Sequence, residues 1–498
     1  MTKQLNKHLC MATMVMGITL FNSAMAVEVH KDRKGDTLAI GITTADSDRE
    51  HAPFSPLPPH NPYTGPSGTS TMHGNSASSD STYNPGPGNG PVTINSQNLN
   101  AVFPTILMGS DGLLVAVGVH YLNQTPYVYL LDPDTLSVLA TQKLVKSTTS
   151  DLAGGIYSYM DPQNRLVLVN AAGYLQRIAH TQQFDGTWTL TISESINIGY
   201  STVVGLVPDY DGRIWFATAQ GVSNGEGAVV GYYDPKTKKI SVYTLPNGEQ
   251  VANSISASPD GVAVASTSAL YLFRAKNNIA SQIWRQLYDQ GPARKPGQLS
   301  WGTGATPTFF GPNTGFEYIT ITDNASPQEN ILVYKARSGK LIGSQPFLTA
   351  RVNSGTEDSA IASGKSIFVP STYGYNYPPS ATTGPSEPAS ATFEGGMQRV
   401  DVLPNERGLV TVWMNQALAS TTVPRLSIKD KLIYTVTIDQ TTGVYSLVTI
   451  NPDTGEVTNT TPLGSGDNYN TLQMVGNIAP TGILYQGTVN GLFSVKAD

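Results

Sequence analysis

Residues Ser201 to Leu245 read STVVGLVPDYDGRIWFATAQGVSNGEGAVVGYYDPKTKKISVYTL and contain one complete structural unit. Four runs rich in β-branched and aromatic residues alternate between apolar and polar side chains. The turn-forming clusters 208–212 and 234–237 separate the first run from the second and the third from the fourth. This pattern predicts a four-stranded antiparallel sheet, which is one blade of a β-propeller if it repeats.

The turns of this unit recur along the chain. Asp-Gly pairs begin at Asp111, Asp211 and Asp260, with spacings of 100 and 49 residues. A repeat of about 50 residues is close to the period of four-stranded propeller blades. We therefore predict an all-β fold, an eight-bladed β-propeller, with seven blades as the alternative number. The predicted innermost strands are residues 102–108, 155–160, 202–207, 251–257, 304–310, 358–362, 423–428 and 469–474.

The last repeat ends early, after strands predicted at 483–488 and 491–496. Its outer fourth strand must then come from upstream of the first blade, and residues 91–96 are the best candidate. We predict that 91–96 pairs with 491–496 and closes the ring, because closure removes the exposed edges of an open sheet.

The first 26 residues have the pattern of a secretory signal peptide. Lys3 and Lys7 precede an apolar segment, and the small residues at 24–26 form a cleavage site. No membrane span is predicted after it, so we expect an exported protein, periplasmic or secreted. Cys10 is the single cysteine, and its removal would leave no disulfide, thiol nucleophile or thiolate metal site.

The charge balance is mildly acidic. Loss of Lys3 and Lys7 takes the formal net charge from −6 to −8, and no cluster of five or more basic residues occurs. Nucleic acid is therefore not an expected partner, because phosphate contacts need concentrated lysine and arginine. We expect a monomer.

Residues 27–90 are predicted to form an N-terminal arm ahead of a propeller that spans 91–498. A short strand is expected at 37–42, but 47–90 consists mainly of Pro, Ser, Gly, Asn and Thr. Such a segment buries little apolar surface, so we expect a linker or an arm laid over the propeller that proteases cut rapidly. Four of the seven histidines lie here, at irregular spacings that fit no compact metal motif: His30, His51, His60 and His73.

A second insertion interrupts the sixth blade at 373–393. Binding residues often lie on surface loops of a rigid scaffold. Tyr373, Tyr375 and Tyr377 could stack on a sugar or another flat ligand, or they could pin the loop to the propeller.

Polar residues near the starts of innermost strands are candidates for a site in the central channel. Oxygen ligands for Ca²⁺ could come from Asn253, Glu357 and Asp358. Arg425, Asp467 and Asn470 lie near the starts of the last two blades and could bind a ligand. The alternative is that all these side chains fix loops by bonding to backbone amides.

Two family resemblances bear on function. Residues 253–261, NSISASPDG, resemble a stretch of the gluconolactonase, regucalcin and strictosidine-synthase-like propellers. That resemblance implies a metal ligand at Asn253 and a metal-dependent hydrolase or lyase.

The blade endings ARSGKLIG at 336–343 and INPDTGEV at 450–457 are instead similar to the turns of quinoprotein-type eight-bladed propellers. The alcohol dehydrogenases of that family carry a vicinal cysteine pair, which this chain lacks. The resemblance therefore implies a non-enzymatic scaffold of the same shape.

Two functional hypotheses follow. The first is an exported binding scaffold for a protein or glycan partner, which binds through the channel and the 373–393 insertion. The second is a hydrolase or lyase with Ca²⁺ in the channel.

Overall fold

The computed structural model describes residues 26–31, 37–43, 54–146, 154–223 and 225–498, and the chain divides into two units at Pro53. In the first unit, β1 (Ala26–Lys31) and β2 (Thr37–Thr43) form an antiparallel hairpin, and β2 contains the predicted strand 37–42. The predicted signal peptide lies outside the described residues, apart from Ala26. No helix with the length and hydropathy needed to cross a bilayer occurs in the described part of the chain.

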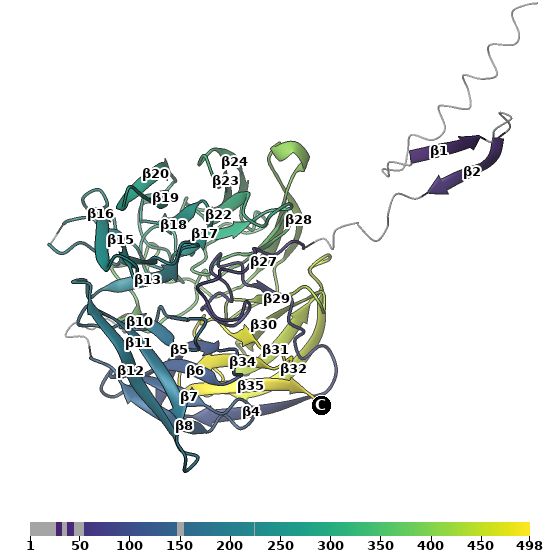
Figure 1. The fold of residues 1–498 in the computed structure, drawn as a ribbon. Coiled ribbons are helices and arrows are strands. Elements are labelled where there is room, and N and C mark those ends of the chain that lie inside the picture. Colours follow the sequence, from purple (N-terminus) through teal and green to yellow (C-terminus); the bar gives the residue numbers. More distant parts are fainter. Residues whose placement is uncertain (1–25, 32–36, 44–53, 147–153, 224) are drawn as a thin grey trace, which may run out of the picture. The chain divides into compact units, whose positions relative to one another are not determined.

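The second unit, residues 54–498, contains eight blades of four antiparallel strands, which confirms the predicted fold (Figure 1). Blades one to four comprise β5 (Ala101–Met108), β6 (Leu114–His120), β7 (Pro126–Leu131) and β8 (Val138–Lys143); β9 (Tyr159–Met160), β10 (Leu166–Val169), β11 (Tyr174–Gln182) and β12 (Trp188–Asn197); β13 (Val203–Pro208), β14 (Ile214–Thr218), β15 (Val229–Asp234) and β16 (Lys239–Thr244); and β17 (Ser256–Ser258), β18 (Gly261–Ala265), β19 (Ala269–Lys276) and β20 (Ile279–Leu287).

Blades five to eight follow the same order from the channel outward. They comprise β21 (Thr308–Phe310), β22 (Tyr318–Thr322), β23 (Asn330–Lys335) and β24 (Leu341–Pro346); β25 (Ile361–Ser363), β26 (Ser366–Pro370), β27 (Met397–Val402) and β28 (Leu409–Asn415); β29 (Arg425–Ser427), β30 (Leu432–Asp439), β31 (Val444–Ile450) and β32 (Val457–Ser465); and β33 (Asn477–Ile478), β34 (Leu484–Thr488), β35 (Gly491–Ala497) and β4 (Val92–Asn98). Two short 3₁₀ turns, η1 (Pro379–Ala381) and η2 (Pro404–Glu406), lie in loops of blade six.

The hydrophobic core is divided among the spaces between blades. Eight clusters of buried side chains each join two neighbouring blades, and one of them joins blade eight back to blade one. The middle strands are therefore buried on both faces, as in β14, whereas the outer strand β16 alternates between exposed and partly exposed residues. This packing explains why the inner runs of the sequence are almost continuously apolar.

Ring closure occurs as predicted. Strand β4 pairs antiparallel with β35 from Val92 opposite Ala497 to Asn98 opposite Gly491. Figure 1 shows these two strands side by side, β4 in blue and β35 in yellow.

The innermost strands differ in detail from the prediction. In blades four to eight they are only two or three residues long and begin later than expected. The largest difference is in blade eight, where the predicted strand 469–474 precedes the observed β33. The residues upstream of these short strands line the channel instead of extending the blade.

The largest correction concerns residues 54–90, which we call the plug. The prediction that this segment buries little surface is wrong for these residues, because most of residues 69–82 are buried and Ser70, Ser79 and Asp80 are fully so. Its strand β3 (Ser81–Thr82) adds to blade seven, parallel to β29. Figure 1 shows the plug in dark purple inside the ring. Residues 47–53 of the predicted arm lie outside the described residues.

Hydrogen bonds connect the plug to the innermost strand of every blade. In six blades a backbone N–H of the innermost strand donates to a carbonyl oxygen of the plug; these donors are Met108, Met160, Ala257, Phe309, Ala362 and Leu426. In the other two blades the plug donates: the side-chain amide of Asn61 bonds to Pro208 O, and that of Asn84 bonds to Ile478 O. The innermost strands are sheet edges with unpaired backbone groups. The plug supplies their partners, and its small side chains allow it to lie close to them.

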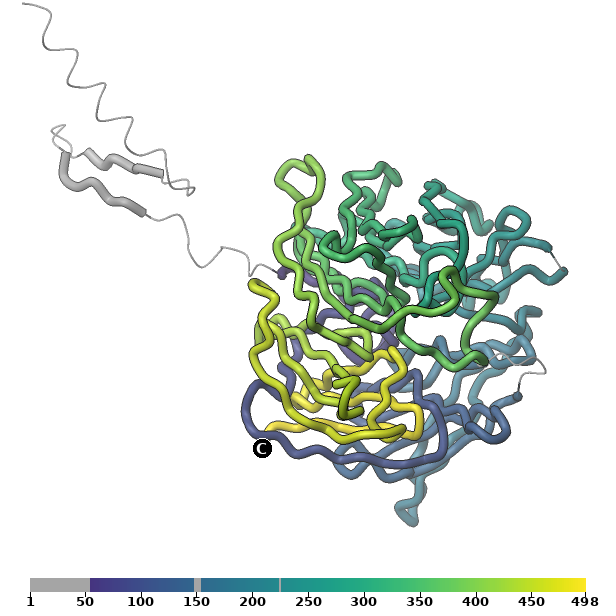
Figure 2. The backbone as a smooth tube through the Cα atoms, turned by 180° about the vertical axis from the view of Figure 1, so that it is seen from behind, coloured from purple at the N-terminus to yellow at the C-terminus, as the bar shows by residue number. Residues whose placement is uncertain are grey.

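The insertion between β26 and β27 crosses the ring on the opposite face, where it is seen in green in Figure 2. It is tied to the loop that leads into blade five. Gly374 N donates to Pro296 O over 2.9 Å, and Thr383 N donates to Leu299 O over 2.8 Å. The plug and the insertion therefore close the channel from its two ends.

Candidate functional site

A chamber of about 620 Å³ lies in the channel between the plug and the insertion. Met72 and His73 of the plug line one end, and Tyr377 and residues 380–383 of the insertion line the other. The side wall is formed by the segments at the starts of the innermost strands, and its apolar part includes Val102, Pro104, Val204, Val251, Val423 and Val475. The volume and the mainly apolar wall suit a small organic molecule.

Two of the predicted site residues meet in this wall. Asn253 Nδ2 donates to Glu357 Oε1 over 2.9 Å and also to the carbonyl oxygen of Gly304. Asn253 Oδ1 accepts a hydrogen bond from the hydroxyl of Tyr157, and Glu357 Oε2 accepts one from Leu299 N. The carboxyl of Glu357 is thus held by two neutral donors, and burial raises its pKa to about 7.

Asp358, the third residue of the predicted metal set, is 2 % exposed and also lines the chamber. Within the described residues its Oδ2 has no hydrogen-bond partner. Burial, together with the nearby carboxyls of Glu357 and Asp80, raises the pKa of Asp358 well above its ordinary value. A buried polar atom without a partner is costly, which marks Asp358 as a group that a ligand could satisfy.

Beneath the floor of the chamber lies a buried ion pair that includes Asp80, a residue that the sequence analysis did not single out. His73 Nδ1 lies 2.9 Å from Asp80 Oδ2, and Arg425 donates to Asp80 Oδ1 over 2.8 Å. Arg425 is also bonded through Nε to Gly476 O and through a terminal nitrogen to Asn477 Oδ1. Asp80 and Arg425 are both buried, so this pair locks the plug to blades seven and eight.

The three tyrosines of the insertion differ in their surroundings. Tyr375 packs edge-on against Tyr377 and Phe393, and its hydroxyl donates to Asn470 Oδ1. Tyr377 is buried and lines the chamber, whereas Tyr373 is partly exposed. The packing of Tyr375 and Tyr377 fits the alternative in which these tyrosines hold the loop, and Tyr377 is placed to touch a ligand as well.

The remaining candidates lie apart from the chamber. Arg425 lies beneath its floor, in the ion pair with Asp80, and does not line it. Asp467 is exposed, and Asn470 is half-buried with its oxygen bonded to Tyr375 and to Leu472 N. The structure therefore does not bring Arg425, Asp467 and Asn470 together in one site.

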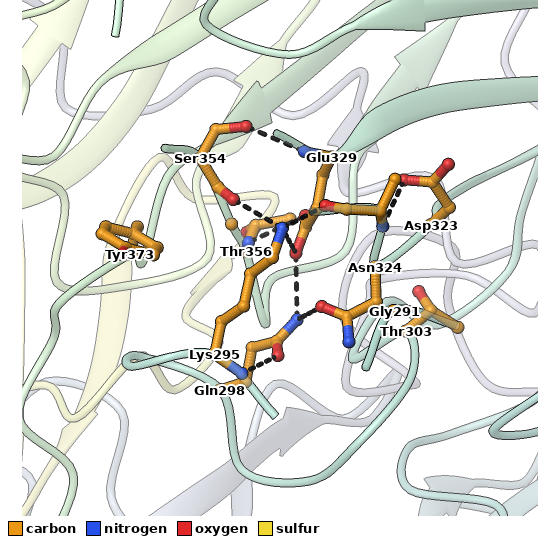
Figure 3. Close-up of polar contacts among 12 residues, drawn as sticks. Gly291, Lys295, Gln298, Thr303, Asp323, Asn324, Glu329, Ser354, Thr356 and Tyr373 are labelled. Carbon is orange, nitrogen blue, oxygen red and sulfur yellow. Dashed lines mark hydrogen bonds and ion pairs between the residues drawn. The ribbon is translucent and has the colours of Figure 1, made fainter. Parts of the chain in front are cut away.

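A buried polar cluster holds the loop that carries Glu357 (Figure 3). Lys295 Nζ lies 3.8 Å from Glu329 Oε1 and donates to Ser354 O over 2.9 Å, while Glu329 Oε2 accepts from Thr356 N over 3.0 Å. Burial lowers the pKa of Lys295 and raises that of Glu329 to about 8. The cluster fixes the backbone one residue before Glu357, and it is not itself among the residues that line the chamber.

Calcium binding at Asn253, Glu357 and Asp358 stays a prediction. In this arrangement the amide nitrogen of Asn253, and not its oxygen, faces Glu357. The described residues contain no group of three or more His, Cys, Asp or Glu side chains suited to hold a metal ion. Ca²⁺ takes six to eight oxygen ligands, and these residues as arranged do not offer such a set.

The raised pKa of Glu357 predicts a pH-dependent stability. The folded protein binds a proton at Glu357 up to about pH 7 and the unfolded chain only up to about 4.5, so stability falls as pH rises through this window. Glu357→Gln removes the effect. We expect the difference in unfolding free energy, variant minus wild type, to increase by roughly 3 kcal/mol from about pH 4 to about pH 8, because only the wild type loses this stabilisation. Urea denaturation at a series of pH values measures this, with exposed Glu456→Gln as the matched control; a flat difference for Glu357→Gln would contradict it.

Comparisons with known proteins establish the fold and leave the activity open. No family model matches the chain. It is 23 % identical over 318 residues to an uncharacterized protein of Archaeoglobus fulgidus, and the match covers 58 % of this chain and 60 % of that protein. The chain thus spans less than two thirds of the length of this relative.

Among solved structures, the quinohemoprotein alcohol dehydrogenase ADHIIG from Pseudomonas putida HK5 is 12 % identical with a TM-score of 0.52, covering 86 % of this chain and 80 % of that one. Sqt1 from Chaetomium thermophilum is 11 % identical with the same TM-score of 0.52, covering 82 % and 99 %. A putative 6-phosphogluconolactonase from Bacteroides uniformis is 12 % identical with a TM-score of 0.34, covering 74 % and 85 %. The similarity to quinoprotein-type eight-bladed propellers is thereby confirmed for the fold, whereas the local resemblance of residues 253–261 stays a prediction.

Proposed function

We propose that this protein is an exported propeller that binds one small, largely apolar organic molecule in the chamber between its plug and its insertion. The observation that carries the proposal is the chamber itself, with a volume of about 620 Å³ and a mainly apolar lining surface that includes several valine side chains. Polar side chains also line the chamber, among them Asn253, Glu357 and Asp358, and apolar surface combined with placed polar groups is typical of ligand sites. A protein or glycan partner that binds at the channel mouth and the 373–393 insertion, as the sequence suggested, stays a prediction.

The plug supports this proposal because it turns an open channel into a chamber with a floor. Plug bonds reach the far ends of the innermost strands, such as Met108 in β5 and Pro208 in β13. The near ends of the same strands, with Val102 and Val204, are left to face the chamber. A ligand in this space would therefore contact the plug at one end, the insertion at the other and the channel wall between them.

The proposal is tested by filling the chamber. N-phenyl-1-naphthylamine is an uncharged probe whose fluorescence rises in apolar surroundings, and we expect it to bind wild-type protein at one site per chain. Val102 is partly exposed on the chamber wall, so Val102→Trp places a large side chain in the space without overpacking a core. We expect the affinity for the probe to fall at least tenfold.

The matched control is Val410→Trp on the outer strand β28, where Val410 is 41 % exposed. It should leave probe binding unchanged. Wild-type protein that gives no fluorescence rise, or equal binding by the two tryptophan variants, would refute the proposal. Thermal unfolding of each variant checks that the fold is retained.

A further inference from the structure

The ionisable residues that line the chamber are unbalanced in charge. Glu357 and Asp358 contribute two adjacent carboxyl groups, and His73 is at the floor. Among the described residues that line the chamber there is no lysine or arginine. An anionic ligand would therefore meet two carboxyls and no fixed cation.

The charged groups packed around these carboxyls do not neutralise them. Arg294 lies near enough to Glu357 to favour its ionised form, but its guanidinium donates to the carbonyl oxygens of Gln298 and Gly384 and to neither carboxyl. The charge of Asp80 helps to raise the pKa of Asp358, and Asp80 is itself paired with Arg425 and His73. The hydroxyls of Tyr375 and Tyr377 are the other titratable groups near Asp358.

The partners of the two carboxyls are neutral or missing. Glu357 accepts from the Asn253 amide and from Leu299 N, and Oδ2 of Asp358 accepts from no described residue. Burying a carboxylate without a counter-ion is costly. A cation bound beside Glu357 and Asp358 would supply that counter-ion and stabilise their ionised forms. Burial accordingly raises the pKa of both groups.

The surroundings favour an organic cation over a metal ion. A hard cation needs six to eight oxygens, whereas both oxygens of Glu357 already accept from N–H groups. The lining surface of the chamber is otherwise mainly apolar, and Tyr157 and Tyr377 are among the residues that line it. Aromatic rings attract ammonium groups through their faces.

We propose that the chamber takes its ligand as a lipophilic ammonium ion, with the nitrogen at the carboxyls of Glu357 and Asp358 and the apolar body against the valine side chains of the wall. This inference rests on the proposed function and names the chemical class of the ligand. The ammonium donates hydrogen bonds to Asp358 and Glu357 and supplies the positive charge that the chamber lacks.

The test compares three probes of one shape: 4-phenylbutylamine, 4-phenylbutan-1-ol and 4-phenylbutyrate. Each is titrated against wild-type protein carrying N-phenyl-1-naphthylamine, and displacement of the fluorescent probe gives its affinity. At about pH 8 we expect the amine to bind at least tenfold more tightly than the alcohol, and the carboxylate to bind most weakly. Because the carboxyls must lose their protons to pair with the amine, the amine affinity should fall at least tenfold from about pH 8 to pH 5.

Variants identify the groups responsible. The ratio of amine to alcohol affinity should fall at least tenfold in Glu357→Gln and stay unchanged in Glu456→Gln, where Glu456 is exposed. Asp358→Asn is the second variant if Glu357→Gln does not fold, and the same fall in the ratio is expected.

The outcomes separate the two proposals. Equal binding of all three probes, or a carboxylate that binds as tightly as the amine, overturns the ammonium inference and leaves the proposed function standing. Binding of none of the three to a chamber that holds N-phenyl-1-naphthylamine likewise overturns the inference alone. If Ca²⁺ raises the melting temperature through Glu357 while the amine does not bind, the cation is a metal and the inference is wrong.

Discussion

Asp80→Ala should destabilise the protein by about 3 to 5 kcal/mol, the range expected when one partner of a buried ion pair is removed. Arg425 is 4 % exposed and would be left without the carboxylate that lies 2.8 Å from it. The loss would also free His73 at the chamber floor, since its Nδ1 is bound to the same carboxyl. Guanidinium chloride denaturation monitored by tryptophan fluorescence measures the change.

A second variant shows that the effect comes from the pair. Asp80→Ala with Arg425→Met leaves neither charge of this pair, and we expect it to be more stable than Asp80→Ala alone. The surface pair of Asp134 and Lys496, 3.7 Å apart, is the control, and Asp134→Ala should change stability by less than about 0.5 kcal/mol. If Asp80→Ala were as mild as Asp134→Ala, the plug would not be held by this pair.

Removal of residues 1–91 should prevent cooperative folding of the remaining chain, even though β4 and all eight blades are retained. The plug bonds to the innermost strands of all eight blades, and each backbone hydrogen bond contributes roughly 0.5 to 1.5 kcal/mol. Their sum is comparable to the whole stability of a typical domain. Its loss would also expose the inner sheet edges to water and to other chains.

The control for this truncation removes residues 1–53 only, up to the boundary between the two units. It should unfold at the same temperature as the full chain in scanning calorimetry, whereas the chain that starts at Val92 should show no sharp transition. A Val92 chain with full stability would contradict our account of the plug.

The blades could be predicted from the sequence because their determinants are local. Alternating runs and turns such as Asp211-Gly212 set each sheet, and the missing fourth strand of the last repeat identified residues 91–96 as the closing strand. Asn253 and Glu357 could be singled out because both precede innermost strands, and starts of such strands face the channel. Their hydrogen bond of 2.9 Å joins residues 104 positions apart.

The plug could not be predicted from its composition. A segment of Ser, Thr, Gly, Asn and Pro buries little apolar surface, which is why the composition of residues 47–90 suggests a mobile arm. The plug is ordered instead by hydrogen bonds between its backbone and the edges of the innermost strands. Amino-acid composition does not indicate such bonds. Asp80 was missed for the same reason, since its partner Arg425 lies more than 300 positions further along the chain. The Lys295 and Glu329 pair has no sequence signal either, because each residue is isolated in a loop or at a strand start.

A crystal structure of the full chain grown with N-phenyl-1-naphthylamine tests the central claim most directly. We predict one probe molecule inside the ring, between Met72 and His73 on the plug and Thr382 on the insertion, in contact with Val102 and Val251. Density for the probe only on the outer surface, or a plug that lies outside the channel, would contradict the account.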